Sequence, residues 1–127
     1  FIRRFHESKV AKSPEVQCWG SGTPRREFLH VDDLAEACIH LMEHYNEAGW
    51  VNVGTGSDVS IKNLAEIVAD AVGFKGDIKW DKSKPDGTPR KLLDISKMRN
   101  IGWSASIDLI DGISSVYEKY LNEHIEA

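Results

Sequence analysis

The stretch EFLHVDDLAEACIHLMEHYNEAGWVNVGTG, residues 27–56, decides the fold class. Glu27 to Val31 predicts a short strand, and Asp32 is a suitable cap for the helix that follows. The helix carries apolar side chains at i, i+3, i+4, i+7, i+8 and i+11, the period of one buried face: Leu34, Ala37, Cys38, Leu41, Met42 and Tyr45. Trp50 to Val53 predicts a further strand. Alternation of strand and helix indicates an α/β fold.

The same alternation continues on both sides of this stretch. Upstream, residues 1–12 predict a helix and Val16 to Trp19 a strand. Downstream, Ser60 caps a helix that Gly73 ends, and Asp108 caps the last helix. Between these two helices we expect a strand from Ile78 to Asp81, a loop over 82–90, an extended segment at 92–93 and a short helix from 96 to about 102. The whole chain, residues 1–127, is therefore expected to form one small α/β domain with about three main helices and short strands.

Composition excludes some classes of protein. With 41% hydrophobic residues the chain can bury a core, and no apolar run approaches the roughly 20 residues of a membrane helix. The chain shows no signal peptide and starts at Phe1, inside a predicted helix, which favours a piece of a longer protein. Cys18 and Cys38 form no C-x-x-C motif. We expect them to be reduced, buried and small hydrophobic residues of a cytoplasmic protein.

Charge is distributed unevenly along the chain. The net charge is -4, yet residues 1–30 hold six Lys/Arg against three Glu, and residues 79–99 hold seven Lys/Arg against three Asp. Two basic islands in an acidic chain could meet at one anion site, or could be ordinary surface asymmetry. The pI of about 5.7 argues against a nucleic-acid-binding surface.

Three motifs suggest chemistry that their context does not support. Gly54-Thr55-Gly56 follows a predicted strand, but Val59 stands where a dinucleotide fingerprint needs a third small residue, so no cofactor site is expected. His40 and His44 match H-x-x-E-H but have no third ligand, so no metal site is expected. His6 and His30 have no partner nucleophile, and we expect both to make local hydrogen bonds. No catalytic residue is predicted in the chain.

The loop SKPDGTPRK, residues 83–91, is the most unusual segment. Its end presents Arg90 and Lys91, groups suited to phosphate, and Asp86 could accept hydrogen bonds from a sugar or base. Trp19 can stack on a ring, and Arg25 or Arg26 can reach a phosphate. Together these residues describe a nucleotide-diphosphate-sugar site, with a surface loop held by ion pairs as the alternative.

At this point a family resemblance becomes visible. WGSGTPRREFLHVDDLA, residues 19–35, resembles extended short-chain dehydrogenase/reductases that act on nucleotide sugars, and SKPDGTPRKLLD, residues 83–94, resembles more narrowly the GDP-L-fucose synthase family. The resemblance implies an enzyme that epimerises GDP-4-keto-6-deoxy-D-mannose at C3 and C5 and reduces its C4 ketone with NADPH. It also implies a homodimeric parent whose cofactor-binding Rossmann domain and catalytic groups precede this stretch.

What the resemblance assigns to this chain is a GDP-sugar-binding shell, and it assigns no cofactor contact. The matching positions are Arg4, Trp19, Arg26, Asp86 and Lys91. By charge, Arg4, Arg26 and Lys91 suit the diphosphate, and Trp19 and Asp86 suit the nucleoside or sugar. The chain by itself is then expected to be inactive and to bind GDP-sugar weakly. Two alternatives stay open: the substrate domain of another nucleotide-sugar epimerase or dehydratase, and a nucleotide-binding module that is not an enzyme.

Overall fold

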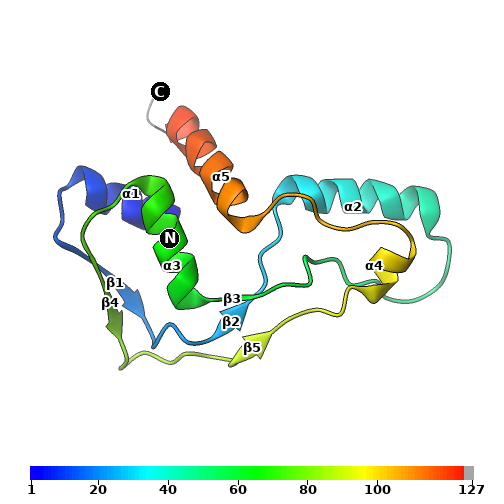
Figure 1. The fold of residues 1–127 in the computed structure, drawn as a ribbon, viewed down its shortest axis with the longest axis horizontal. Helices are drawn as coiled ribbons and strands as arrows, with labels where there is room; N and C mark the ends of the chain where they lie inside the picture. Colours follow the sequence, from blue (N-terminus) through cyan, green and yellow to red (C-terminus); the bar gives the residue numbers. More distant parts are fainter. Residues whose placement is uncertain (125–127) are drawn as a thin grey trace.

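The computed structural model describes residues 1–124. Figure 1 shows an α/β arrangement in which helices and short strands alternate along the chain. The helices and strands are α1 (Ile2–Val10), β1 (Glu15–Trp19), β2 (Arg25–Arg26), α2 (Val31–His44), β3 (Val59–Ser60), α3 (Ile61–Val72), β4 (Asp77–Asp81), β5 (Arg90–Lys91), α4 (Ser96–Asn100) and α5 (Leu109–His124). The predicted α/β class is confirmed, and the three longest helices are α2, α3 and α5.

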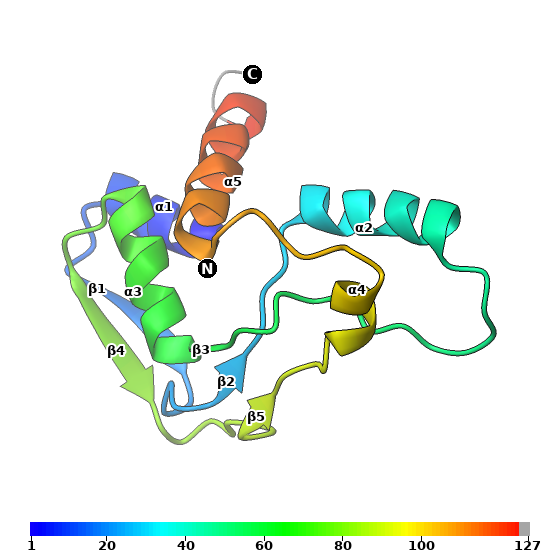
Figure 2. The ribbon, with the colours of Figure 1, turned by 45° about the vertical axis from the view of Figure 1, so that its right-hand side comes forward.

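The strands form two small sheets. β1 and β4 pair in parallel, with Val16 opposite Ile78, and β2 lies between β3 and β5 in the second sheet. β2 is antiparallel to β3 and parallel to β5. Both sheets draw strands from distant parts of the chain, so the 82–90 loop and the 20–24 turn are brought to the same side of the molecule (Figure 2).

The main core lies where α1, α3 and α5 pack together with β1. Its buried residues are Phe5, Val16, Cys18, Leu64, Ala65, Val68, Ala69, Val72, Phe74, Ile113 and Tyr117. A smaller cluster of Ala37, Met98 and Trp103 joins α2 to α4. No helix within residues 1–124 combines the length and apolarity needed to cross a bilayer.

The predicted caps of α3 and α5 are confirmed. Ser60 Oγ accepts a hydrogen bond from the amide of Asn63 at 3.1 Å, and Gly73 ends α3 with φ 75°, the left-handed conformation that glycine adopts at little cost. Asp108 Oδ1 accepts from the amides of Ile110 and Asp111 at 2.8 and 3.0 Å. These bonds satisfy amides that have no partner inside the helix.

The start of α2 differs from the prediction. The expected strand from Glu27 to Val31 is wrong, because the strand is β2, at Arg25–Arg26, and α2 already begins at Val31. Asp32 is not the cap: His30 precedes the helix in an extended conformation, and its Nδ1 accepts a hydrogen bond from the Asp32 amide at 3.1 Å. An imidazole can therefore take the capping role that the sequence rule gives to carboxylates and hydroxyls.

Two further predicted extended segments are not strands. Residues 50–53 make no strand pairing within the described part of the chain; Val51 and Val53 pack instead against the Ala37, Met98 and Trp103 cluster. Downstream, the strand is β5 at Arg90–Lys91 rather than residues 92–93. In both places apolar side chains predict a strand. At residues 50–53 they reflect packing against the small cluster, and at residues 92–93 the side chains are partly exposed.

The predicted apolar face of α2 is only partly buried. Ala37 is fully buried, whereas Met42 is 85% exposed and Cys38 is exposed, so the expectation of a buried Cys38 is wrong. Cys18 is buried as expected. Figure 1 shows the reason: α2 extends away from the main core and contacts the rest of the molecule along one narrow side, near α4.

Candidate functional site

The three-stranded sheet brings two of the predicted site residues together. β2 and β5 pair in parallel with Arg26 opposite Lys91, although 65 residues separate them in the sequence. Because residues directly opposite in a sheet project from the same face, the two cations lie side by side. Within residues 1–124 neither of them makes an ion pair with a carboxylate. This face of the sheet therefore has two cationic groups available for an anion.

On the other face of the same sheet, two arginines share one carboxylate. Arg25 and Arg90 are also opposite each other, and both bind Asp58. Arg25 Nε donates to Asp58 Oδ1 at 2.9 Å, and Arg90 Nε donates to Oδ2 at 2.5 Å. The hydrogen bonds from Arg90 and Arg25 hold the pKa of the Asp58 carboxyl below its usual range. Alternation along two strands thus separates four cations into a paired face and an unpaired face.

Arg26 and Arg4 line one groove. It has a volume of about 810 Å³, and its floor is apolar, with Phe28, Leu64 and Ile113 among the lining residues. Arg4 lies on α1, and its Nη1 donates to the carbonyl of Gln17 in β1 at 3.0 Å. Guanidinium groups above an apolar floor in a groove of this size suit an anionic ligand with a hydrophobic part.

Asp86 and Trp19 lie at the turn after β1 and do not line that groove. Asp86 accepts two hydrogen bonds from Ser21: from the amide at 2.6 Å and from the hydroxyl at 2.8 Å. The Ser21 amide and hydroxyl hold the pKa of Asp86 below its usual range. Trp19 is 69% exposed, and Lys84 Nζ lies 5.4 Å from its ring centroid. The carboxylate therefore fixes the 83–90 loop against the turn, and the indole is available for stacking.

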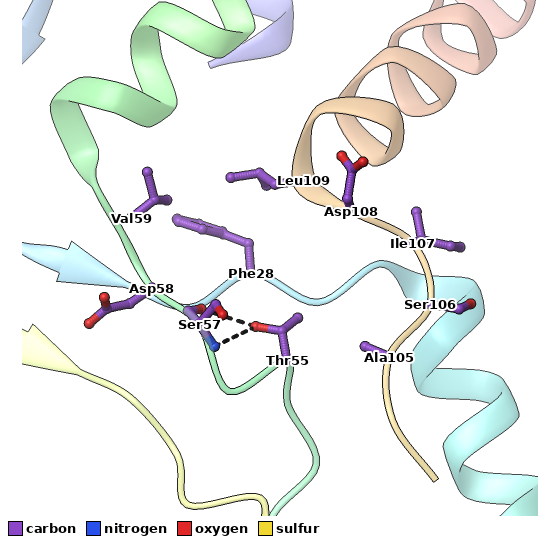
Figure 3. Close-up of a pocket in the computed structure, with 10 residues that line it drawn as sticks. All are labelled: Phe28, Thr55, Ser57, Asp58, Val59, Ala105, Ser106, Ile107, Asp108 and Leu109. Atoms are coloured by element: carbon purple, nitrogen blue, oxygen red, sulfur yellow. Dashed lines mark hydrogen bonds between the residues drawn. The ribbon is translucent and has the colours of Figure 1, made fainter.

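A second cavity of about 300 Å³ lies between the residue 55–59 segment and the start of α5 (Figure 3). Phe28 lines both cavities, and no lysine or arginine lines this one. Its polar groups are largely used internally: Thr55 Oγ1 donates to the Ser57 carbonyl at 3.0 Å and accepts from the Ser57 amide at 3.2 Å. The smaller cavity therefore lacks the charge that a diphosphate requires.

The Glu27 carboxylate binds the turn Gly54-Thr55-Gly56. Glu27 Oε2 accepts from the Gly56 amide at 2.7 Å and lies 3.4 Å from Thr55 Oγ1. A phosphate placed on this turn would meet a negative charge instead of free amides. The structure therefore gives a physical reason why the turn is unsuited to hold a cofactor phosphate.

The histidines make the local contacts expected of them. His6 Nδ1 lies 2.9 Å from Tyr117 Oη, and His30 caps α2. His40 Nε2 lies 2.7 Å from the Ile101 carbonyl, and the His40 ring stacks on that of His44 with 4.2 Å between the ring centroids. Residues 1–124 contain no group of three or more His, Cys, Asp or Glu side chains arranged to hold a metal ion.

Sequence reasoning missed Asp58 and the role of Glu27. Asp58 contacts arginines 33 and 32 residues away, and Glu27 contacts the 55–56 turn and Leu93, 66 residues away. No local spacing signals contacts at such separations. The only available signal was the excess of cations in the two basic islands, since clustered cations are stabilised by a carboxylate placed between them.

The chain matches a protein family, several curated proteins and several solved structures. Residues 1–54 match the NAD dependent epimerase/dehydratase family. The chain is 56% identical over 98% of its length to "Putative GDP-L-fucose synthase 2" of Arabidopsis thaliana and 55% identical over 99% to "Probable GDP-L-fucose synthase 1" of Oryza sativa, and it covers 38% of each. Among solved structures, the GDP-mannoheptose C4 reductase of Campylobacter jejuni with NADP bound superposes with a TM-score of 0.83 at 36% identity, over 94% of this chain and 42% of that one. The chain thus spans about two-fifths of the length of the relatives it matches.

Proposed function

This chain belongs to the family of the GDP-L-fucose synthases over the part of those proteins that it spans, and we propose that it is the GDP-sugar-binding portion of such an enzyme. The parent would convert GDP-4-keto-6-deoxy-D-mannose to GDP-L-fucose by epimerisation at C3 and C5 and reduction at C4. The observation that carries the proposal is the pairing of Arg26 with Lys91 on one face of a sheet whose other two cations are ion-paired with Asp58.

The assignment of site residues follows from charge and position. Arg26 and Lys91 bind the diphosphate, and Arg4, which lines the same groove as Arg26, is the third cation of the site. Trp19 stacks on the nucleoside or sugar, since its ring is largely exposed. Asp86 holds its loop through Ser21, which leaves its remaining acceptor capacity for a ligand hydroxyl. In this proposal residues 1–127 form one substrate domain, and none of them is catalytic.

The cofactor and the partners belong to the parent enzyme. We propose that the parent uses NADPH, held by a Rossmann domain that this chain does not supply, and that it is a cytoplasmic homodimer. A relative of similar structure contains NADP, which supports the choice of cofactor. The Glu27 carboxylate on the Gly56 amide supports a cofactor site elsewhere.

Two alternatives differ from this proposal in measurable ways. If the parent is another nucleotide-sugar epimerase or dehydratase, the paired cations would still bind a diphosphate, but turnover would follow a different sugar or base. If the chain is a nucleotide-binding module without an enzyme, the encoding gene would contain no upstream G-x-x-G-x-x-G and Y-x-x-x-K motifs. Turnover of GDP- and UDP-sugars by the parent enzyme separates the first alternative, and the upstream reading frame separates the second.

The direct test is titration of GDP into the parent enzyme that contains this chain, followed by calorimetry or by NMR shifts of the Arg26 and Lys91 amides. Arg26→Ala and Lys91→Ala should each weaken binding by about tenfold, the loss that corresponds to one charge-assisted hydrogen bond. Lys79→Ala is the matched control, because Lys79 is an exposed strand lysine of the other sheet, paired with Asp77. Unchanged affinity in both site variants would contradict the assignment.

A further inference from the structure

Glu27 lies beside Arg26 in the sequence, directly after β2, and points away from the proposed diphosphate. Arg25 and Glu27 are two residues apart and Arg26 lies between them, so by strand alternation Glu27 projects from the face opposite Arg26. There its carboxylate accepts two backbone amides and no cation: Oε2 accepts from the Gly56 amide at 2.7 Å, and Oε1 accepts from the Leu93 amide at 3.3 Å. Thr55 Oγ1, whose one hydrogen is donated to the Ser57 carbonyl, lies 3.4 Å from Oε2.

These bonds connect both neighbours of β2. Leu93 lies two residues after Lys91, the last residue of β5, and the 54–56 turn leads into β3 at Val59. Figure 1 shows β2 between these two strands. The backbone pairing of β2 extends over only two residues with each neighbour. Such short ladders fix the register weakly, so a carboxylate that binds both sides adds to the constraint that Asp58 provides at this end of the sheet.

The Glu27 carboxylate fills the space where a side chain at Gly54 would lie. A side-chain carbon added at Gly54 would lie 2.6 Å from Glu27 Oε2 and 2.7 Å from Oε1, closer than real contacts allow. Gly54 needs no unusual backbone angle, so this close approach explains why glycine fits at the position. The space at Gly54 is therefore part of the arrangement that holds Glu27.

We propose that Glu27 is a positioning residue for the GDP diphosphate, acting through Arg26 and Lys91, and this inference rests on the proposed function. By tying the 54–56 turn and Leu93 to β2, the carboxylate holds Arg26 and Lys91 opposite each other, at a spacing that one diphosphate can bridge. Pre-organised cations lose less conformational freedom when the ligand binds, so the effect appears as affinity. Glu27 itself does not touch the ligand.

The first test compares variants of the parent enzyme by their affinity for GDP. Glu27→Ala removes both amide bonds and should weaken binding about tenfold, while Glu27→Gln keeps one carbonyl acceptor and should lose less. Gly54→Ala displaces the carboxylate sterically and should reproduce the loss seen in Glu27→Ala. Asp33→Asn is the stability control: it removes a buried carboxylate outside this sheet and should leave GDP affinity within about twofold of the wild type.

A double-mutant cycle separates positioning from general stabilisation. If Glu27 acts through Arg26, Glu27→Ala in an Arg26→Ala background should cost less than about twofold, because the group it positions is already gone. The same tenfold loss in both backgrounds, or no loss in either, would overturn the inference. A parent enzyme that does not bind GDP would overturn the proposed function, and the inference with it. Loss of binding with Arg26→Ala but not with Glu27→Ala or Gly54→Ala would overturn the inference alone.

Discussion

Asp33 on α2 accepts a hydrogen bond from the backbone amide of Ile107 at 3.0 Å, across 74 residues of sequence. The same carboxylate accepts from the amide and the hydroxyl of Ser106. Asp33 is only 1% exposed. Burial by itself would raise its pKa, but the amides of Ile107 and Ser106 outweigh burial and hold the pKa below its usual value. One buried carboxylate thus attaches α2 to the segment that leads into α5.

We therefore expect Asp33→Asn to lower the free energy of unfolding by about 1–3 kcal/mol, the cost typical of leaving buried hydrogen-bonding groups unsatisfied. An asparagine oxygen can replace one acceptor, but its NH₂ group would face amides that also donate. Urea denaturation followed by circular dichroism measures the difference. Asp32→Asn is the control, because that side chain is 80% exposed. Equal stability of the two variants would contradict the structural role of Asp33.

The stability difference between the wild type and Asp33→Asn should depend on pH in one direction. Because the folded pKa of Asp33 is lowered, its contribution is present above the unfolded pKa of about 3.9 and is lost as pH falls through the folded pKa. The stability difference between wild type and Asp33→Asn should be constant near neutral pH and shrink in acid. A difference that grows on acidification would show that Asp33 is not charged in the folded state.

The sequence predicted well wherever a signal was local. Ser60 and Gly73 bound α3 as expected, and Asp108 caps α5, because capping depends on residues within one helical turn. Prediction failed around α2, where the outcome depends on distant partners. His30 takes the cap, Cys38 is exposed, and Val51 and Val53 pack against the cluster that contains Trp103 instead of pairing in a sheet. Apolar periodicity indicates which residues could be buried, but not which of them find a partner.

For the site, the sequence predicted residue types but not their arrangement. Excess cations in two segments, with a family resemblance, identified Arg26 and Lys91, which the fold then places opposite each other. The same charge reasoning could not distinguish Arg26 from Arg25 or Lys91 from Arg90. The distinction is physical: alternation along two paired strands directs Arg25 and Arg90 to Asp58.

That arrangement predicts the titration of Asp58. Its pKa is held low chiefly by the Arg90 hydrogen bond, so Arg90→Ala should raise the pKa of Asp58 toward the ordinary aspartate value. Carbon-detected NMR of the carboxyl carbons over an acid titration measures the shift directly. Arg99→Ala is the matched control, an arginine of α4 that makes no ion pair within residues 1–124. An Asp58 midpoint that is the same in both variants would contradict the bridging geometry.

The exposed side of α2 carries an apolar stripe that predicts self-association of the chain. Val31, Leu34, Cys38 and Met42 follow one another at helical spacing and are all exposed, with Met42 at 85%. An apolar stripe of this kind favours burial against another surface, so the chain should self-associate as its concentration rises. Met42→Glu places a charge in the stripe and should shift the equilibrium to monomer with little effect on unfolding, since the side chain is already in solvent. Sedimentation velocity over a concentration series measures the change, with Asn122→Asp as a control of equal charge on the exposed side of α5. A wild-type chain that stays monomeric throughout, or a Met42→Glu variant that associates equally, would show that this stripe is not the contact surface.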